Sequence, residues 1–339
     1  MIKRYLKRLY QNIKVNIMNE MFDYFVYTFL ITITLFIFGI TIIKHKNYGQ
    51  YVRKLGPATH YKKQGTPIFG GVIIVVGALI GFLFSQKDVN NKNYLLYVTL
   101  FIPVLMYAII GFIDDYLKVR FKNNLGLSVK WKLFFQIVFS IVYYFLISKN
   151  IDTKITIFNL SIDLGYFYII FILLMFVSST NAFNFCDGMD GLAAGISVIC
   201  LSGLLLIAIE KEEKIIISYI LVFIAAILAF ICYNHKPAKI FMGDSGSMAI
   251  GALICNITII LKIEFLLIII GGVMIIETLS IIIQVFYYKV SNGKRIFLMA
   301  PIHHHFELKG IKEKTVVYIF WLIQLFFTVL GYITYKLYY

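Results

Sequence analysis

The chain has 339 residues, of which 60% are hydrophobic and 14% are charged, and its mean hydropathy is +0.84. A soluble domain of this size does not have such a composition, so the sequence excludes a soluble globular protein. Despite the net charge of +15, we expect a membrane protein without a nucleic-acid partner. The cysteines lie within or beside apolar runs without paired spacing, and they predict no disulfide framework: Cys186, Cys200, Cys232 and Cys255.

Ten apolar runs of membrane-crossing length follow one another along the chain. They cover roughly residues 24–43, 68–85, 94–113, 132–148, 165–183, 192–209, 215–233, 247–261, 265–288 and 315–337. Because a helix in lipid must satisfy its own backbone hydrogen bonds, we expect an all-α polytopic membrane protein, built as a bundle of ten transmembrane helices. No loop is long enough for another domain, which predicts a single domain over 24–337 after a basic arm over 1–23. No cleavable signal peptide is expected.

Lysine and arginine are unevenly distributed between the two sets of loops. The odd-numbered loops, with Lys132 at a helix boundary, hold 19 of the 32 basic residues, and the four even-numbered loops hold seven. The positive-inside rule therefore predicts that the odd-numbered loops face the cytoplasm and that both termini lie outside. These loops cover residues 44–67, 114–131, 184–191, 234–246 and 289–314.

The N-terminal arm disagrees with this orientation, since it carries five basic residues on the predicted outer side. One explanation is an amphipathic helix in the membrane interface, and another is a translation start at Met18 or Met21. A third is that the number of spans is wrong by one. The first two are favoured because the remaining loops agree with one another.

Acidic residues recur where apolar runs end, and all of them fall on the predicted cytoplasmic side. A carboxylate at this position needs a cation or a proton. Mg²⁺ prefers carboxylate oxygens and keeps waters that a phosphate can replace, so the pattern predicts a metal-dependent site. The alternative is a solvated helix end paired with Lys118, which lies one helical turn after the first acid. The acids are Asp114, Asp115, Asp187, Asp190 and Asp244.

Loops one and three add polar groups that could contact a substrate. Lys62 and Lys63 stand among glycine and proline turns, which favours contact with an anion or, alternatively, an ordinary positive-inside loop. In loop three, polar residues recur at intervals of three and would share one face of a continuing helix, where they could bind a nucleobase or ribose or support the metal. A capping or turn role is the alternative. These residues are Asn181, Asn184, Asp187 and Asp190.

Loop four places Asp244 in the sequence GDSG at the start of a helix, where backbone N–H groups favour anions. An N-cap by Asp244 or Ser245 is the alternative. Phe241 could stack on a flat base or anchor the chain in the membrane.

Loop five contains three adjacent histidines, His303, His304 and His305, which cannot all face one way. They lack the usual zinc-ligand spacing, whereas phosphate binding, proton transfer or a surface run all fit. Glu277 lies in the middle of the ninth span and is therefore a candidate functional residue, or else pairs inside the bundle. The preceding Gly271 and Gly272 could let this span bend or pack closely.

Five motifs occur in one order: GPATHYKKQGTPIFGG, GFIDDYLK, NAFNFCDGMDGLA, FMGDSGS and MAPIHHHFE. Together they resemble the phospho-N-acetylmuramoyl-pentapeptide transferases, a branch of the polyprenyl-phosphate N-acetylhexosamine-1-phosphate transferases, over about residues 24–337. The resemblance implies ten transmembrane helices, a homodimer, and a place in the bacterial cytoplasmic membrane with the active site facing the cytoplasm. It also implies transfer of phospho-MurNAc-pentapeptide from UDP-MurNAc-pentapeptide to the membrane lipid undecaprenyl phosphate, with Mg²⁺ as cofactor, which gives lipid I and UMP.

The resemblance also implies roles for individual residues. Catalytic positions are Asp114, Asp115, Asp244 and His303, and the three acids would bind Mg²⁺. Substrate-binding positions are Lys63, Lys118, Lys130, Asn184, Asp187, Asp190, Asn234, Phe241, Gln284, His304 and His305. The residues at the uridine end would be Lys63, Asn184, Asp187, Asp190 and Phe241. Gln284 and His304 would lie on the sugar–peptide side, and the span with Glu277 would border a groove for the lipid chain.

Two pairs of residues depart from the family's usual pattern. Ile68-Phe69 stand where Thr-Met is common, and Phe185-Cys186 stand where Leu-Thr is common. Neither replacement removes a charged group, so we expect activity to survive, although ligand contacts near these positions are less transferable.

Other functions leave different traces in a sequence. A sister branch that uses UDP-GlcNAc is the nearest alternative, and the PIHHHFE motif favours the muramoyl donor instead. An ion-coupled transporter would carry most of its charges in mid-span and show repeated halves. Here the acids gather at one face without a convincing internal repeat, and a structural scaffold would not need five ordered motifs. Direct attack by the lipid phosphate and a covalent phospho-sugar intermediate both stay open.

Overall fold

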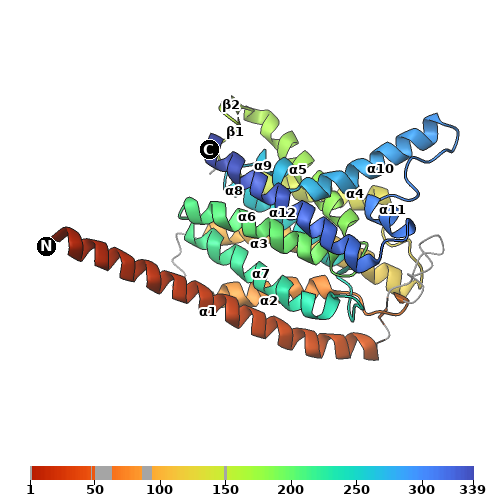
Figure 1. The fold of residues 1–339 in the computed structure, drawn as a ribbon, viewed down its shortest axis with the longest axis horizontal. Helices are drawn as coiled ribbons and strands as arrows, with labels where there is room; N and C mark the ends of the chain where they lie inside the picture. Colours follow the sequence, from red (N-terminus) through yellow and green to blue (C-terminus); the bar gives the residue numbers. More distant parts are fainter. Residues whose placement is uncertain (1, 47, 50–62, 86–93, 149–150) are drawn as a thin grey trace.

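The protein is described by a computed structural model that covers residues 2–46, 48–49, 63–85, 94–148 and 151–339, with side chains from residue 20 onward. Helices make up most of the described chain and pack side by side as a bundle (Figure 1). The longer helices are α1 (Ile2–His45), α2 (Gly70–Ser85), α3 (Tyr94–Arg120), α4 (Val129–Ile147), α5 (Tyr168–Cys186), α6 (Leu192–Glu210), α7 (Lys214–Asn234), α8 (Gly243–Ile260), α10 (Gly272–Val290) and α12 (Glu313–Tyr338). The shorter elements are β1 (Lys154–Ile157), β2 (Leu160–Asp163), η3 (Gly165–Phe167), α9 (Leu266–Ile270) and α11 (Ile302–Leu308).

Within the described ranges, nine helices are long and apolar enough to cross a membrane. Helix α2, with 16 residues, is a shorter apolar helix. The structure thus confirms an all-α polytopic membrane protein, and the count of ten spans stays a prediction. The predicted span 265–288 is divided at Gly271 into α9 and α10, which is the bend that its paired glycines allow.

Helix α1 includes the backbone of the N-terminal arm and runs without a break into the first predicted span. Its N-terminal part projects beyond the other helices (Figure 1). The division between arm and domain, and the role of the arm, stay predictions.

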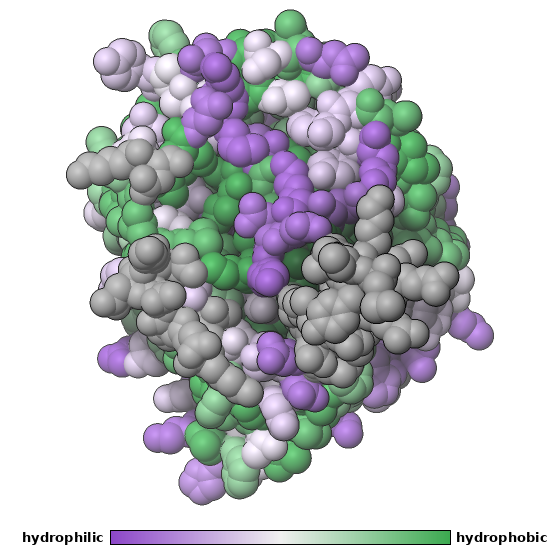
Figure 2. All heavy atoms as spheres, turned by 90° about the vertical axis from the view of Figure 1, so that its left-hand side faces the viewer, coloured by the Kyte–Doolittle hydropathy of each residue, from purple (hydrophilic) through white to green (hydrophobic). Residues whose placement is uncertain are grey.

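A short antiparallel hairpin, β1–β2, lies at the end of the bundle that also carries the C-terminus (Figure 1). The hydroxyl of Tyr339 donates to the carbonyl of Thr156 at 2.5 Å and joins the two. Figure 2, which faces this end, shows hydrophilic side chains gathered amid hydrophobic ones. Ion pairs here include Lys262–Glu264 and Lys336–Glu210. Polar groups with apolar surroundings are typical of a membrane bundle that ends in water.

The core of the bundle lies around α8, which packs against α2, α3 and α5. Its side chains are almost all buried, and so are most of those on α7. Polar residues inside this core must therefore find partners in protein rather than in water. This arrangement places the first residue pair of α8, Gly243-Asp244, beside the end of α3.

A polar contact at the centre of the bundle compensates for a proline inside α3. Pro103 has no N–H, so it leaves the carbonyl of Thr99 without its helical partner. The side-chain amide of Asn256 donates to this carbonyl at 3.1 Å and to that of Leu100 at 2.9 Å. Tyr143 in turn donates its hydroxyl to Asn256 Oδ1 at 2.6 Å. The contact joins α3, α4 and α8 and supports the helix that carries the first acidic pair.

Replacement of Asn256 by leucine should lower the free energy of unfolding by about 2 kcal/mol, because the carbonyl of Thr99 and the buried hydroxyl of Tyr143 lose their partner, whereas the carbonyl of Leu100 keeps the hydroxyl of Tyr219. Thermal unfolding in detergent measures the change. Ser202→Ala is the matched control, since its exposed hydroxyl bonds only within its own helix, to the carbonyl of Val198. Equal melting temperatures for Asn256→Leu and wild type would show that the contact does not stabilise the fold.

Candidate active site

The described parts of the five odd-numbered loops meet at the end of the bundle opposite the hairpin (Figure 1). Two groups of charged residues connect them. The acid cluster consists of Asp114, Asp115 and Asp244, and the loop network consists of Lys63, Asp190, Lys236 and Glu313.

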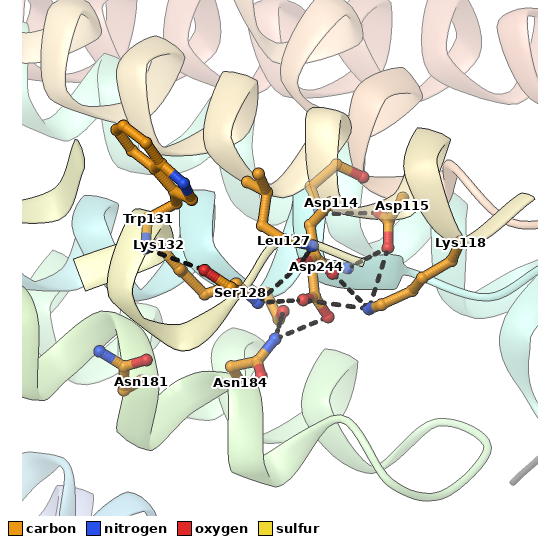
Figure 3. A network of polar contacts seen from close by, with 12 residues as sticks. Asp114, Asp115, Lys118, Leu127, Ser128, Trp131, Lys132, Asn181, Asn184 and Asp244 are labelled. Carbon is orange, nitrogen blue, oxygen red and sulfur yellow. Dashed lines mark hydrogen bonds and ion pairs between the residues drawn. The ribbon is translucent and has the colours of Figure 1, made fainter. Parts of the chain in front are cut away.

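The acid cluster brings together the end of α3 and the start of α8 (Figure 3). One carboxylate oxygen of each aspartate lies within 4.8 Å of those of the other two. Asp114 and Asp115 are buried, and the side chain of Asp244 is 17% exposed. The cluster therefore opens to solvent mainly at Asp244.

Asp115 holds the first turn of α8 in place. Its Oδ1 accepts from the backbone N–H of Asp244 at 3.1 Å, and its Oδ2 accepts from that of Ser245 at 3.0 Å. These N–H groups have no partner within their own helix, and the helix dipole favours a carboxylate there. Gly243 has φ +76°, and a Cβ atom there would lie 2.5 Å from Asp115 Oδ2. The GDSG sequence thus needs glycine at this turn, and Asp115 positions Asp244.

Two lysines lie among the three acids (Figure 3). Lys118 Nζ is 2.5 Å from Asp114 Oδ2 and 3.2 Å from Asp244 Oδ2. Lys132 Nζ is 2.6 Å from Asp244 Oδ2 and 3.3 Å from Asp114 Oδ1. The close cluster of three carboxylates and two ammonium groups has a formal charge of −1. Such a cluster can bind a divalent cation and can turn ammonium groups toward a phosphate.

Lys132 is a site residue that sequence reasoning did not identify, whereas Lys130, which the resemblance implied, is exposed. Ser128 caps the start of α4 by accepting from the N–H of Trp131, and this cap fixes the residue at which the helix begins. Lys132 then lies one turn before the buried Gln136, on the same face. That spacing of a lysine and a glutamine in an apolar run was the available signal.

Helix α5 ends at Cys186, so the predicted polar face of one continuing helix holds for Asn181 and Asn184, whereas Asp187 and Asp190 lie in the turns that follow. Asn184 Nδ2 donates to Asp244 Oδ1 at 3.0 Å and to Ser247 Oγ at 2.7 Å. Asn181 donates to Gln136 Oε1 at 3.0 Å. The pKa of Asp187 is raised to about 7, because burial removes water from its carboxyl group and because Asp244 and other acids lie nearby.

The loop network contains Lys63 and Asp190, together with two residues that the sequence did not single out. Lys63 Nζ lies 2.7 Å from Asp190 Oδ1 and 2.7 Å from Glu313 Oε1, and Lys236 Nζ lies 2.5 Å from Glu313 Oε2. Burial opposes the charge of Lys63, but the two carboxylates outweigh it and raise the pKa of this lysine. Asn234 joins the same loops, since its Oδ1 accepts from the N–H of Gly191 at 2.9 Å.

The three histidines face different ways, as expected from their adjacency. His303 Nδ1 lies 3.1 Å from Glu277 Oε1, and both side chains are fully buried. The other ring nitrogen of His303 approaches loop three at Gly188, where a Cβ atom would lie 2.2 Å away. His304 Nδ1 is 3.5 Å from Glu307 Oε2, and His305 Nδ1 accepts from the N–H of Leu298 at 3.0 Å. Only His303 therefore reaches toward loop three from inside the bundle among these histidines.

Gln284 and Phe241 contact neighbouring backbone. Gln284 donates to the carbonyl of Phe297 at 2.9 Å, and its Oε1 accepts from the N–H of that residue at 2.9 Å. Phe241 accepts from the N–H of Gly70 at 2.9 Å and donates its own N–H to Pro67 at 2.8 Å. In this structure Gln284 holds loop five on α10, and the backbone of Phe241 joins loop four to loop one.

Of the four residues that depart from the family's pattern, Ile68, Phe69 and Cys186 are buried, and Phe185 is half-buried. Ile68 and Phe69 are buried and pack with Val119 in a small apolar cluster. Cys186 is fully buried and free, and its thiol donates to the carbonyl of Ala182 at 3.5 Å. Ile68, Phe69 and Cys186 thus pack against apolar neighbours inside the protein.

The acid cluster offers Mg²⁺ a suitable set of ligands. Its carboxylate oxygens come from two helix ends, lie within 4.8 Å of one another, and include no nitrogen or sulfur ligand. Hard oxygen ligands of this kind are those that Mg²⁺ prefers. Lys118 and Lys132 balance part of the negative charge, so a cation would compete with their ammonium groups for the same oxygens.

Comparison with known proteins gives consistent matches. A family model described as glycosyl transferase family 4 matches residues 97–262. The phospho-N-acetylmuramoyl-pentapeptide-transferase of Oceanobacillus iheyensis is 42% identical over 311 residues, which cover 90% of this chain and 95% of the relative. The Listeria innocua protein of the same name is 43% identical and covers 88% and 92%, respectively. That of Geobacillus sp. is 40% identical and covers 90% and 94%. Identity at this level over nearly the whole chain shows that it belongs to the phospho-N-acetylmuramoyl-pentapeptide transferase family.

Proposed function

We propose that the protein transfers phospho-MurNAc-pentapeptide from UDP-MurNAc-pentapeptide to undecaprenyl phosphate, which yields lipid I and UMP. The observation that carries this proposal is the acid cluster with Lys118 and Lys132, at the end of membrane-spanning helices in a chain of this family. Oxygen ligands for a divalent cation and ammonium groups for phosphate are the parts that phosphoryl transfer between two anions requires. The distribution of basic residues supports a place in the bacterial cytoplasmic membrane with this site facing the cytoplasm.

In the proposed reaction, an oxygen of the lipid phosphate attacks the phosphorus atom bonded to the sugar. The new P–O bond forms as the bond between that phosphorus and the bridging oxygen breaks, and UMP leaves with the bond electrons. Mg²⁺ bound by Asp114, Asp115 and Asp244 would supply positive charge at the pyrophosphate. Lys118 and Lys132 would offset the negative charge that develops on UMP.

Asp114 is the candidate for the lipid phosphate, as a base or as a positioning group. Its Oδ1 accepts from the N–H of Leu127 at 2.8 Å, which ties the loop after α3 to the cluster, and its Oδ2 faces Lys118. A covalent phospho-sugar on an aspartate is the alternative route. Recovery of labelled phospho-sugar on the protein after incubation without lipid phosphate would contradict direct attack.

The remaining substrate contacts and the oligomeric state belong to the same proposal. The uridine end of the donor would lie near Lys63, Asp187 and Asp190, and the sugar and peptide near His304 and Gln284. The family resemblance supports a homodimer. His303, held against Glu277 and next to loop three, is the histidine best placed to act at the reacting phosphates.

The test is UMP release by the full-length protein in detergent, with UDP-MurNAc-pentapeptide, undecaprenyl phosphate and Mg²⁺. We expect release that needs both the lipid and the metal and that chelation with EDTA stops. Turnover with UDP-GlcNAc in place of the muramoyl donor would assign the chain to a sister branch. A folded protein that releases no UMP from either donor would refute the proposed reaction.

A further inference from the structure

Glu313 is a buried carboxylate that belongs to none of the five motifs. It is the first residue of α12, and its side chain is only 2% exposed. Taking a carboxylate out of water is unfavourable unless charges and hydrogen bonds compensate, so the contacts of this group are informative.

The contacts of Glu313 reach three different loops. Its Oε1 accepts from Lys63 Nζ of loop one at 2.7 Å and from the backbone N–H of Asp190 in loop three at 3.0 Å. Its Oε2 accepts from Lys236 Nζ of loop four at 2.5 Å. Asp190 closes the network, since its Oδ2 accepts from the N–H of Ala238 at 3.1 Å. One carboxylate thus fixes three segments that are far apart in the sequence.

Backbone hydrogen bonds connect loops one and four between this network and the acid cluster. Beyond Lys63, the carbonyl of Pro67 accepts from the N–H of Phe241 at 2.8 Å. Next to it, the N–H of Gly71 donates to Met242 at 2.9 Å, and Met242 lies two residues before Asp244. Glu313 therefore holds one end of the segments that flank the acids, and the cluster lies at the other end.

We propose that Glu313 is a positioning residue. It holds Lys63 and the loops around it so that the nucleotide-linked donor binds with its pyrophosphate at the acid cluster. This inference rests on the proposed function. Both carboxylate oxygens of Glu313 accept hydrogen bonds from other protein groups. Glu313 therefore acts through Lys63, Asp190 and Lys236 rather than on the substrate.

The effect should fall on the donor rather than on the lipid. The network lies in loops at the aqueous end of the bundle, from which a water-soluble anion has to approach, whereas a prenyl chain stays in the bilayer. With Glu313 uncharged, Lys63 would keep Asp190 as its one carboxylate partner, Lys236 would lose its ion pair, and Lys63 would turn toward water. Its positive charge would then no longer be held where the donor binds.

The experiment compares Glu313→Gln and Glu313→Asp with wild type by steady-state UMP release, with each substrate varied in turn. For Glu313→Gln we expect the KM for the nucleotide donor to rise about 10- to 100-fold, since one partner of a buried charge pair is lost. The KM for undecaprenyl phosphate should change by less than about twofold, and Glu313→Asp should recover most of the donor affinity. Glu213→Gln is the matched control, because this exposed glutamate precedes α7 at the opposite end of the bundle.

Lys236→Met provides a second variant in case Glu313→Gln fails to fold. It removes one cation from the same carboxylate but leaves Glu313 with Lys63 and Asp190, so a smaller rise in donor KM is expected. Equal increases in both KM values, or a loss of kcat alone, would overturn the positioning role while wild-type activity upheld the reaction. Wild-type protein without lipid-dependent UMP release would overturn both proposals.

Discussion

Replacement of Asp244 by asparagine is expected to slow UMP release by about 100- to 1000-fold. Asp244 is the most exposed acid of the cluster, and three side chains contact it: Lys118 and Lys132 both contact its Oδ2, and Asn184 donates to its Oδ1. The amide would remove a metal ligand and one negative charge, and it would place an N–H₂ group or a neutral oxygen against two ammonium groups. The measurement is kcat with saturating substrates and Mg²⁺.

Metal binding by the same variant separates this effect from misfolding. Mn²⁺ affinity of Asp244→Asn, followed by titration of the folded protein, should fall together with activity, while the melting temperature shows whether the bundle is intact. Asp23→Asn is the control, since this aspartate is exposed on α1 away from the cluster. Activity of Asp244→Asn within threefold of wild type would mean that the acid cluster is not the catalytic centre.

The second large effect distinguishes two lysines on one helix. Lys132→Met should reduce kcat by about 100-fold, because its ammonium group lies 2.6 Å from Asp244 and would stabilise charge on the pyrophosphate or on UMP. Lys130→Met should change kcat by less than about twofold, since Lys130 is exposed at the start of the same helix. Both substitutions remove one positive charge from α4, so the pair controls for net charge.

The outcome also decides between the family resemblance and the structure. The resemblance places the side chain of Lys130 in the catalytic cleft. In the structure, α4 begins at the Ser128 cap, and Lys132 is instead the lysine that contacts the acid cluster. If Lys130→Met loses activity and Lys132→Met keeps it, the loop before α4 must rearrange when substrates bind. Loss of activity in both variants would indicate that both ammonium groups contact the phosphates of the substrates.

Much of the architecture could be predicted from the sequence because it depends on local properties. A run of apolar residues such as 94–113 has to form a helix in lipid, since only internal hydrogen bonds satisfy its backbone there. The acids that follow such runs must lie near the membrane surface, and the positions of Asp114 and Asp244 at helix ends agree with this. The small hairpin β1–β2 escaped prediction because its strands have only four residues each, so their apolar–polar alternation is too short to stand out between two long apolar runs.

The partners of each site residue could not be predicted in the same way, because they depend on how helices rotate and pack against one another. Glu277 stood out as a mid-span acid, but only the packing of α10 against α11 places it 3.1 Å from His303. Gln284 matched a substrate-binding position, yet its amide is occupied by the backbone of loop five. The sequence thus identified these side chains as polar groups in apolar surroundings, whereas their contacts in the folded protein decided what they do.

By itself, the sequence determined that this is a helical membrane protein with acids, lysines and histidines gathered on one side in the order of its family. Hydropathy and residue order suffice for this, since both are read along a single chain. Only the tertiary structure decided that Asp115 positions α8, that Lys132 joins the acids, and that Glu313 connects three loops. Residues 63 and 313 become neighbours through packing alone, because a buried charge selects its partner by distance in space and not by separation in sequence.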